Sequence, residues 1–424
     1  MRRYDSYKDS GVEWLGDVPS HWELKRLKQL FVEKKHKQNL SLNCGAISFG
    51  KVIEKDDDKV TEATKRSYQE VLKGEFLINP LNLNYDLISL RIALSEIDVV
   101  VSAGYVVLKA KQIINKKYFS YLLHRYDVAY MKLLGSGVRQ TINYGHISDS
   151  ILVAPPLSEQ QKIAQFLDDK TAKIDQAVDL AEKQIALLKE HKQILIQNAV
   201  TRGLNPDVSL KDSGVEWIGQ VPEHWEVKKI KHVTSKIGSG ITPLGGGSNY
   251  IDGGIPLLRS QNIHFDRIDL NDVARISEFT HNSMKNSKVR KGDVLLNITG
   301  GSLGRCFYVD SNEEMNVNQH VCIIRPNKKI NTIFLNMLLA SEIGQKQIWF
   351  FQQGGGREGL NFQAIKNFYL PLPDLEEQQK IAIYLNKQAT KIDQAIALKT
   401  AHIEKLKEYK SVLINDVVTG KVRV

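Results

Sequence analysis

The chain carries an internal duplication that extends over most of its length. KDSGVEWLGDVPSHWELKR at 8–26 returns with few changes as KDSGVEWIGQVPEHWEVKK at 211–229. EQQKIA occurs at 159–164 and again at 377–382, an interval of 218 residues (377 − 159). Repetition on this scale indicates a chain built from two copies of one structural unit. Each copy has the same order: a head motif, a block of variable sequence, and a stretch that begins with EQQKIA.

Each EQQKIA motif opens a predicted long helix, one over residues 158–203 and the other over 374–424. Apolar residues recur in both at spacings of three, four and seven, which makes a narrow stripe suited to pairing with another helix. Gly203 and Pro206 are stop signals for the first helix. At about 1.5 Å per residue this helix would be on the order of 65 Å long, which is too long for one compact core.

We predict that the two helices are partners for each other and pack antiparallel. KIDQA occurs in both, at 173–177 and 391–395, and Lys192 and Lys410 interrupt the two stripes at equivalent positions. The residues expected to pair the helices are Leu167, Ile174, Val178, Ile185, Leu188 and Leu195 in the first and Leu385, Ile392, Ile396, Ile403, Leu406 and Leu413 in the second.

The variable blocks predict an α+β fold in each copy, with domains expected over residues 1–157 and 204–373. KGEFLIN at 73–79 and KGDVLLN at 291–297 each indicate a turn followed by a buried strand. LKRLKQL at 24–30 and VKKIKHV at 227–233 alternate lysine with apolar residues, and each predicts a half-buried strand. The whole chain is therefore expected to hold two similar α+β domains separated by two long antiparallel helices.

Composition narrows the function classes. The chain is 42% hydrophobic and 25% charged, and no apolar run approaches the ~20 residues that span a bilayer. Its three cysteines, Cys44, Cys306 and Cys322, show no CxxC spacing, which argues against a disulfide framework or a zinc site and fits a cytoplasmic protein. The net charge of +10 favours a polyanionic partner such as nucleic acid.

The motifs that could carry catalysis are weak. His21 and His224 of the head motifs could be catalytic, but a turn followed by aromatic packing around Trp22 and Trp225 is the favoured interpretation. Asn79-Pro80-Leu81 lacks the second proline and the aromatic residue of amino-group methyltransferases. No GxxxxGK[ST] phosphate loop is present, and no HExxH or nucleophile-elbow GxSxG motif stands out. These observations favour recognition over catalysis.

The side chains that hydrogen-bond base edges and phosphates, Arg, Lys, Asn and Gln, gather in polar loops of the variable blocks. In the second block these loops are KIGSGITPLGGG (236–247), LLRSQNIHF (257–265) and NITGGSLGR (297–305). The predicted DNA-contacting residues are Lys65, Arg66, Asn82, Asn84, Arg139, Gln140 and Asn143 in the first domain, and Ser239, Thr242, Arg259, Gln261, Asn262, Thr299, Arg305, Gln319, Arg357 and Asn361 in the second. Arg139 and Arg357 are equivalent by the repeat, as are Asn143 and Asn361.

Over essentially its whole length, the chain resembles the DNA-specificity subunits of type I restriction–modification enzymes. The residues that carry the resemblance are the head motifs GVEWLGDVPSHWELKRL and GVEWIGQVPEHWEVKKI, and the helix starts PPLSEQQKIAQFLD and LPDLEEQQKIAIYLN with KIDQA downstream. KIGSGITP, LLRSQNI and NITGGSLGR are also similar to that family. The first variable block departs from it, because it lacks the GSGITP and LRSQNI motifs.

The resemblance implies a subunit that catalyses nothing by itself. Two target-recognition domains would each read one half of a split, asymmetric site in double-stranded DNA. The helices would set the spacer between the half-sites and dock methyltransferase subunits, usually two, to which nuclease/translocase subunits add. No cofactor is expected in this chain, since S-adenosylmethionine, ATP and Mg²⁺ would be bound by the partner subunits.

Two other interpretations stay open. The chain could be a stand-alone DNA methyltransferase or endonuclease, in which case the purified chain would turn over with DNA, S-adenosylmethionine, Mg²⁺ and ATP. It could also be a DNA-binding regulator whose helices dimerise with another copy, which hydrodynamic mass with and without a methyltransferase partner would reveal.

Overall fold

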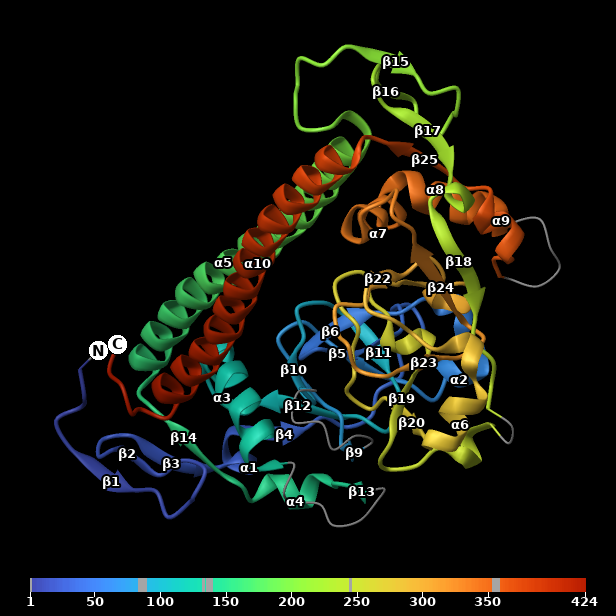
Figure 1. Cartoon of the computed structure of the whole chain (residues 1–424). Coiled ribbons are helices and arrows are strands. Elements are labelled where there is room, and N and C mark those ends of the chain that lie inside the picture. Colours follow the sequence, from blue (N-terminus) through green and yellow to red (C-terminus); the bar gives the residue numbers. More distant parts are fainter. Residues whose placement is uncertain (1, 83–89, 132–133, 135–139, 244–245, 353–358) are drawn as a thin grey trace. The chain divides into compact units, whose positions relative to one another are not determined.

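The computed structural model describes residues 2–82, 90–131, 134, 140–243, 246–352 and 359–424 (Figure 1). Contacts divide the chain into two compact units. Unit 1 comprises Met1–Ala181 and Thr400–Val424, and unit 2 comprises Glu182–Lys399. Each unit therefore contains one head motif, one variable block, and parts of both long helices.

Unit 1 holds the first variable block. Its helices are α1 (Leu27–Leu30), η1 (Asp57–Lys59), α2 (Glu62–Lys65), α3 (Lys116–Ala129) and α4 (Tyr144–Ser148). Its strands are β1 (Tyr7–Asp9), β2 (Asp17–Pro19), β3 (Glu23–Arg26), β4 (Phe31–Glu33), β5 (Gly45–Ser48), β6 (Lys51–Glu54), β7 (Gln69–Val71), β8 (Phe76–Ile78), β9 (Leu81–Asn82), β10 (Ile92–Leu94), β11 (Val99–Val101), β12 (Val106–Ala110), β13 (Gln140–Thr141) and β14 (Ile151–Ala154).

Unit 2 holds the second variable block. Its helical elements are η3 (Ile230–His232), η4 (Gly246–Asn249), η5 (Ser260–Asn262), α6 (Glu278–Ser283), η6 (Lys285–Ser287), η7 (Gly300–Ser302), α7 (Thr332–Ala340), α8 (Glu342–Gln352) and α9 (Phe362–Lys366). Its strands are β15 (Leu210–Asp212), β16 (Gln220–Pro222), β17 (Glu226–Lys229), β18 (Thr234–Ser239), β19 (Ile255–Leu258), β20 (Ala274–Ile276), β21 (Val294–Asn297), β22 (Cys306–Tyr308), β23 (Asn316–Val317), β24 (Val321–Pro326) and β25 (Tyr369–Leu372).

The two variable blocks share one sheet topology. The antiparallel order β10-β8-β12-β4 of unit 1 returns in unit 2 as β22-β21-β24-β18. The head hairpin β1-β2 corresponds to β15-β16, and the pair β3-β14 to β17-β25. KGEFLIN and KGDVLLN lead into β8 and β21, which are buried at every position, as predicted. The repeat seen in the sequence is thus a repeat of fold, and each unit is α+β.

The predicted strand over 24–30 is wrong beyond Arg26. β3 ends there, and Leu27–Leu30 form the helical turn α1; in unit 2, η3 follows β17 in the same way. Leu27 and Leu30 are both fully buried. A spacing of three places them on one face of a helical turn but on opposite faces of a strand, so the burial of both fits the helical turn.

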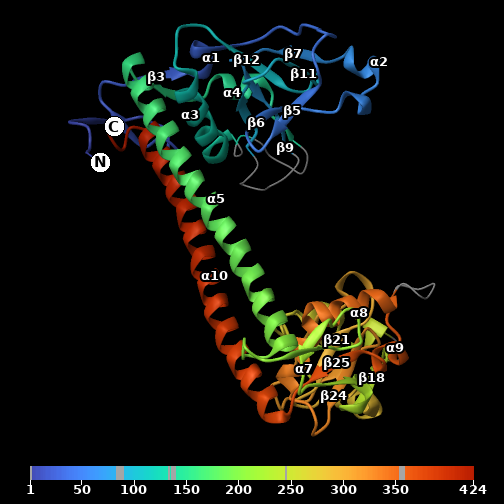
Figure 2. The same ribbon diagram turned by 90° about the horizontal axis from the view of Figure 1, so that it is seen from above.

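The long helices α5 (Leu157–Arg202) and α10 (Leu375–Val418) run side by side (Figures 1 and 2). In unit 1, Lys410 Nζ lies 2.6 and 2.7 Å from the carboxylate oxygens of Asp175; in unit 2, Lys192 Nζ lies 2.7 and 2.8 Å from those of Asp393. These four residues are related by the 218-residue interval, so the same contact occurs twice. Only antiparallel helices allow that reciprocity, which confirms the predicted direction.

The predicted stripe residues of both helices are shielded from solvent. Fully buried members are Leu167, Ile174, Leu385, Ile392, Ile403 and Leu413, and half-buried members are Val178, Ile185, Leu188, Leu195, Ile396 and Leu406. The ends of the helices also enter the core of each unit, where Leu167 joins the cluster around Trp22 and Leu385 joins the cluster around Trp225.

The EQQKIA motif anchors each head motif to the start of a long helix. Trp22 Nε1 donates to Glu159 at 3.0 Å, and His21 Nε2 lies 2.7 Å from the same carboxylate. In unit 2, Trp225 and His224 make the same contacts with one carboxylate, at 3.1 and 2.9 Å. Burial raises the pKa of Glu159, but hydrogen bonds from Trp22, His21 and Tyr4 outweigh it and lower the pKa below its ordinary value. The structure therefore favours the packing interpretation of the head histidines.

The glutamine that follows each of these glutamates is buried and ties the helix to the variable block. Gln160 accepts from the backbone N–H of Asn115 at 2.9 Å and donates to a proline carbonyl. Gln378 does the same with Asn331 at 2.7 Å. Asn115 and Asn331 are the N-caps of α3 and α7. The repeated Glu-Gln pair thus fixes each α+β domain to its helix; Figure 2 shows α3 beside α5 in unit 1.

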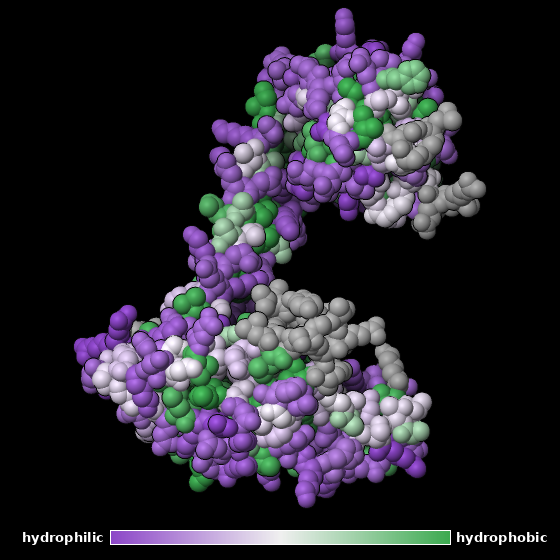
Figure 3. Space-filling model, turned by 90° about the horizontal axis from the view of Figure 1, so that it is seen from below, coloured by the Kyte–Doolittle hydropathy of each residue, from purple (hydrophilic) through white to green (hydrophobic). Residues whose placement is uncertain are grey.

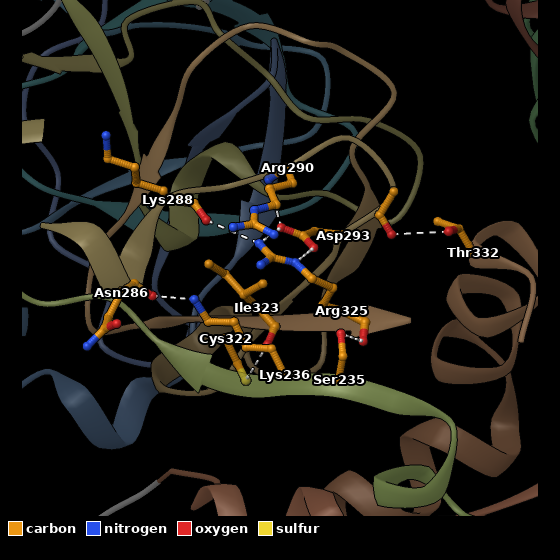
Figure 4. Close-up of polar contacts among 11 residues, drawn as sticks. Ser235, Lys236, Asn286, Lys288, Arg290, Asp293, Cys322, Ile323, Arg325 and Thr332 are labelled. Atoms are coloured by element: carbon orange, nitrogen blue, oxygen red, sulfur yellow. Dashed lines mark hydrogen bonds and ion pairs between the residues drawn. The ribbon is translucent and has the colours of Figure 1, made fainter. Parts of the chain in front are cut away.

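An ion pair in the core sheet of unit 2 holds β24 to the turn before β21 (Figure 4). Asp293 is fully buried and accepts from Arg325 Nε at 2.7 Å, from Arg325 Nη2 at 2.8 Å and from the backbone N–H of Arg290 at 2.7 Å. In unit 1 the equivalent Glu75 accepts from the backbone N–H of Leu72 and from Lys34, both at 2.8 Å. The turn and its acid recur, whereas the cation lies in β24 in unit 2 and directly after β4 in unit 1.

Candidate nucleic-acid interface

Polar loops of unit 2 meet at one end of its main sheet. Gly240, which follows β18, donates its N–H to Asn318 O at 3.1 Å, and Asn297 at the end of β21 donates through Nδ2 to Ser260 O at 2.7 Å. A Cβ at Gly240 would lie 1.7 Å from Val317 O, so this close approach requires glycine. The three loops singled out in the sequence and the turn before β24 therefore form one cluster.

A chain of hydrogen bonds links three of the predicted contact residues. Thr242 donates to Gln319 Oε1, Gln319 Nε2 lies 3.0 Å from His320 Nε2, and His320 Nδ1 lies 2.7 Å from Thr299 Oγ1. Thr242 and Gln319 are exposed. His320 is not among the residues predicted from the sequence; its signal is the polar run Asn-Gln-His directly before the buried strand β24.

The LRSQNI loop is held by its own residues. Asn262, 2% exposed, accepts from the backbone N–H of Arg259 at 2.9 Å and donates to Asp269 O at 3.0 Å. These contacts favour a positioning role for Asn262. Gln261 is exposed, and the half-buried Arg259 guanidinium lies over the Tyr250 ring, 5.7 Å from its centroid. Ser239 and Arg305 are half-buried at the other loops of the cluster.

Asn143 and Asn361 have the same position in their units. Each is the N-cap of a short helix, α4 or α9, and its side chain accepts a backbone N–H three residues on, from His146 at 3.1 Å or Ala364 at 2.7 Å. The residue before each asparagine donates its backbone N–H to the segment that follows the buried strand. Ile142 N donates to Pro80 O and Leu360 N to Ile298 O, both at 2.9 Å. Arg139 and Arg357, predicted to contact DNA, lie outside the described residues.

The other predicted residues of unit 1 lie on separate segments. Lys65 donates to Asp57 at 2.6 Å, and this bond together with the one from the backbone N–H of Cys44 lowers the pKa of Asp57 to about 2. Arg66 is exposed and pairs with Glu62 at 2.8 Å. The backbones of Asn82 and Gln140 pair between β9 and β13. Asn84 is outside the described residues. Lys65 and Arg66 therefore each pair with an acid of their own segment.

The described residues offer little for nucleophilic or metal chemistry. Burial raises the pKa of the Cys306 and Cys322 thiols to about 12, which keeps both protonated at neutral pH. No group of three or more His, Cys, Asp and Glu side chains in the described ranges is placed to hold a metal ion. Among the helices described, none is both long and apolar enough to cross a membrane.

The family model that matches this chain matches it twice, once in each copy of the repeat. The family model for the type I restriction modification DNA specificity domain matches residues 19–189 and again 222–408. The EcoBI specificity subunit of Escherichia coli is 30% identical over 277 residues, covering 63% of this chain and 57% of that subunit. The putative MjaX specificity subunit of Methanocaldococcus jannaschii is 25% identical over 97% of this chain and 96% of its own length.

The match to the Escherichia coli subunit thus spans little more than half of that relative. Solved structures share the fold across nearly the whole chain. A chain from a structure on complex assembly and conformational transition of the type I R-M system has a TM-score of 0.71 at 14% identity, covering 96% of this chain and 99% of that one. The HsdS subunit of Thermoanaerobacter tengcongensis gives 0.54 at 16% identity, covering 98% and 100%. With the family model matched in both copies, the chain belongs to the family of type I restriction–modification DNA specificity subunits.

Proposed function

We propose that the chain is the non-catalytic subunit that selects the DNA target of a type I restriction–modification complex. Each unit reads one half of a bipartite, asymmetric site in double-stranded DNA, and α5 and α10 set the spacer between the halves. Methyltransferase subunits supply the transfer from S-adenosylmethionine, and nuclease/translocase subunits join the complex and use ATP and Mg²⁺.

One observation carries the proposal: the two units share one sheet topology, but the polar loops attached to the sheets differ. The backbone hydrogen bonds from Ile142 to Pro80 and from Leu360 to Ile298 have the same length and occupy equivalent positions in the two units. The loop cluster around Gln319, in contrast, has Thr, Gln and His side chains that unit 1 does not repeat in sequence. A shared frame with different polar loops fits a protein that reads two different half-sites.

The helix pair supports docking of two copies of one partner. On α5, Leu180, Leu187 and Ile194 follow one another at intervals of seven and are 58%, 63% and 49% exposed. On α10, Leu398 and Val412 occupy the positions equivalent to Leu180 and Ile194 and are 73% and 50% exposed. Hydrophilic residues cover most of the visible face of each unit, and apolar side chains lie among them along the helices (Figure 3). Matched apolar positions on a duplicated chain present similar surfaces to two identical subunits.

Sequencing of methylated bases in a host with and without this gene tests the proposal. We expect one motif of two short specified halves, separated by an unspecified spacer, to be methylated only when the gene is present. The purified chain alone should transfer no methyl group to DNA and should do so after a methyltransferase partner is added. A continuous motif, or methyl transfer by the chain alone, would contradict the proposed role.

A further inference from the structure

His320 is fixed on every side within the loop cluster of unit 2. Its ring nitrogens contact Thr299 Oγ1 at 2.7 Å and Gln319 Nε2 at 3.0 Å. Its backbone N–H donates to Asn318 Oδ1 at 3.0 Å, and its carbonyl accepts from Ile298 N at 3.0 Å. These four contacts fix the orientation of the His320 ring, and the ring in turn restricts the side chains that are hydrogen-bonded to it.

The hydrogen-bond directions along the chain follow from the placement of Gln319 Oε1 beside Thr242 and Nε2 beside His320. The Gln319 amide nitrogen can only donate, so His320 Nε2 accepts. The proton of the neutral ring then lies on Nδ1 and is donated to Thr299 Oγ1. Gln319 Oε1 accepts from the Thr242 hydroxyl at the other end. His320 and Thr242 together contact both polar atoms of the amide and restrict its rotation.

The network leaves part of the hydrogen-bonding capacity of the exposed Gln319 amide unused. An amide has two N–H donors and two acceptor lone pairs, and the network uses one of each. One donor and one acceptor remain for a ligand. In the major groove, adenine offers an acceptor, N7, beside a donor, the N6 amino group, and a glutamine amide pairs with both at once. Guanine presents acceptors at N7 and O6 instead, which this remaining pair cannot both satisfy.

We propose that His320 is a positioning residue that holds the Gln319 amide to read an A·T base pair in the half-site bound by unit 2. The inference rests on the proposed function, because it assigns one base pair of the DNA site to one side chain. Thr299 on the NITGG loop and Thr242 on the GSGITP loop complete the support.

Two substitutions distinguish the contact made by His320 Nδ1 from the contact made by Nε2. In His320→Asn the amide occupies the place of Nδ1 and can keep the bond to Thr299, but it does not reach Gln319. In His320→Gln the amide extends to the place of Nε2 and can accept from Gln319. If His320 served only to hold the loops, the Thr299 contact would matter most and His320→Asn would be the milder change. If it orients Gln319, the order is reversed.

The test uses the complex reconstituted with its methyltransferase partner and a pool of duplexes of randomised sequence, with the bound fraction sequenced. Wild type should enrich one bipartite motif. Gln319→Ala and His320→Asn should both lower the preference at one A·T position of one half-site by about tenfold, the scale of a bidentate base contact. His320→Gln should keep most of that preference. The other half-site, read by unit 1, should be unchanged in all three and reports that the complex is intact.

The inference is overturned if Gln319→Ala leaves every position unchanged, if the affected position is not A·T, or if His320→Asn retains the preference that His320→Gln loses. A uniform loss of binding across the motif would also overturn it, because it would assign a purely structural role to His320. If wild type enriches no bipartite motif, the proposed function itself fails. A motif that persists while these variants leave it intact refutes only the assignment of Gln319 and His320.

Discussion

Trp22→Ala is expected to destabilise unit 1 by about 3–5 kcal/mol, the range for removing a large buried aromatic side chain. Trp22 is fully buried, and its ring lies in the core that joins the head motif to the start of α5. Its Nε1–H also donates to Glu159. The substitution therefore removes both the packing and one of the bonds that fix the head to the helix.

Hydrogen exchange resolved by peptide measures this effect within each unit. We expect faster exchange in β1–β3 and the first turns of α5, and little change in unit 2. Trp225→Ala is the matched variant and should show the reverse pattern, since Trp225 makes the same bond to Glu377 at 3.1 Å. Trp22→Phe keeps most of the apolar contact and should cost about 2–3 kcal/mol, because it removes a hydrogen bond to a carboxylate. Equal exchange in both units for either alanine variant would contradict the account.

Arg325→Ala should cost unit 2 about 3–5 kcal/mol, because it leaves the buried Asp293 carboxylate without its cation. Both guanidinium contacts are short, and the Asp293 side chain is 1% exposed. The backbone N–H of Arg290 alone cannot compensate the charge. The loops at the other end of the sheet should be destabilised only to the extent that β24 becomes less stable.

The measurement is hydrogen exchange in β21 and β24, followed against denaturant. Lys291→Ala is the matched control: it removes a cation from the same turn, but its pair with Asp310 is exposed, so a change of about 0–1 kcal/mol is expected. Adding Asp293→Asn to Arg325→Ala should recover part of the loss, since the amide still accepts from Arg290 and carries no charge. If Lys291→Ala were as damaging as Arg325→Ala, burial of Asp293 would not be the cause.

Features set by local spacing could be predicted from the sequence. The stripes of α5 and α10 and the buried strands after KGE and KGD follow from periodicity, and the equivalence of Lys192 with Lys410 follows from the repeat. The prediction failed at Leu27–Leu30, where the alternation of lysine with apolar residues indicated a strand although a spacing of three fits a helical turn. What decided between them was burial of both leucines in a core assembled from distant segments.

The interactions that shape the candidate site could not be predicted in this way. Thr242 and Gln319 are 77 residues apart, and Trp22 and Glu159 are 137 apart. Nothing local marks them as partners; only the folded sheet and the head motif bring them together. The repeat did offer a clue for the second pair, since Trp, His and Glu recur together in both copies, but it offered none for His320, whose partners are specific to unit 2.

The spacer function of the helices is the central claim, and a paired insertion tests it most directly. Four residues added to α5 after Ala181 and four to α10 after Lys399 fall at equivalent places on the boundary between the units. They leave each unit's own contacts intact, including the pairs of Lys192 and Lys410. One added turn lengthens the pair by about 6 Å, roughly one or two base pairs at about 3.4 Å each.

Sequencing of methylated bases in a host that carries the inserted chain gives the answer. We predict the same two half-sites with a spacer longer by about one or two base pairs. The wild-type chain and a chain with the insertion in α5 alone serve as controls. Lengthening only one helix prevents the pairs Lys192–Asp393 and Lys410–Asp175 from both staying in register, so the single insertion should lower methylation at all sites. An unchanged spacer, or altered half-sites, in the doubly inserted chain would contradict the claim that the helices set the spacing.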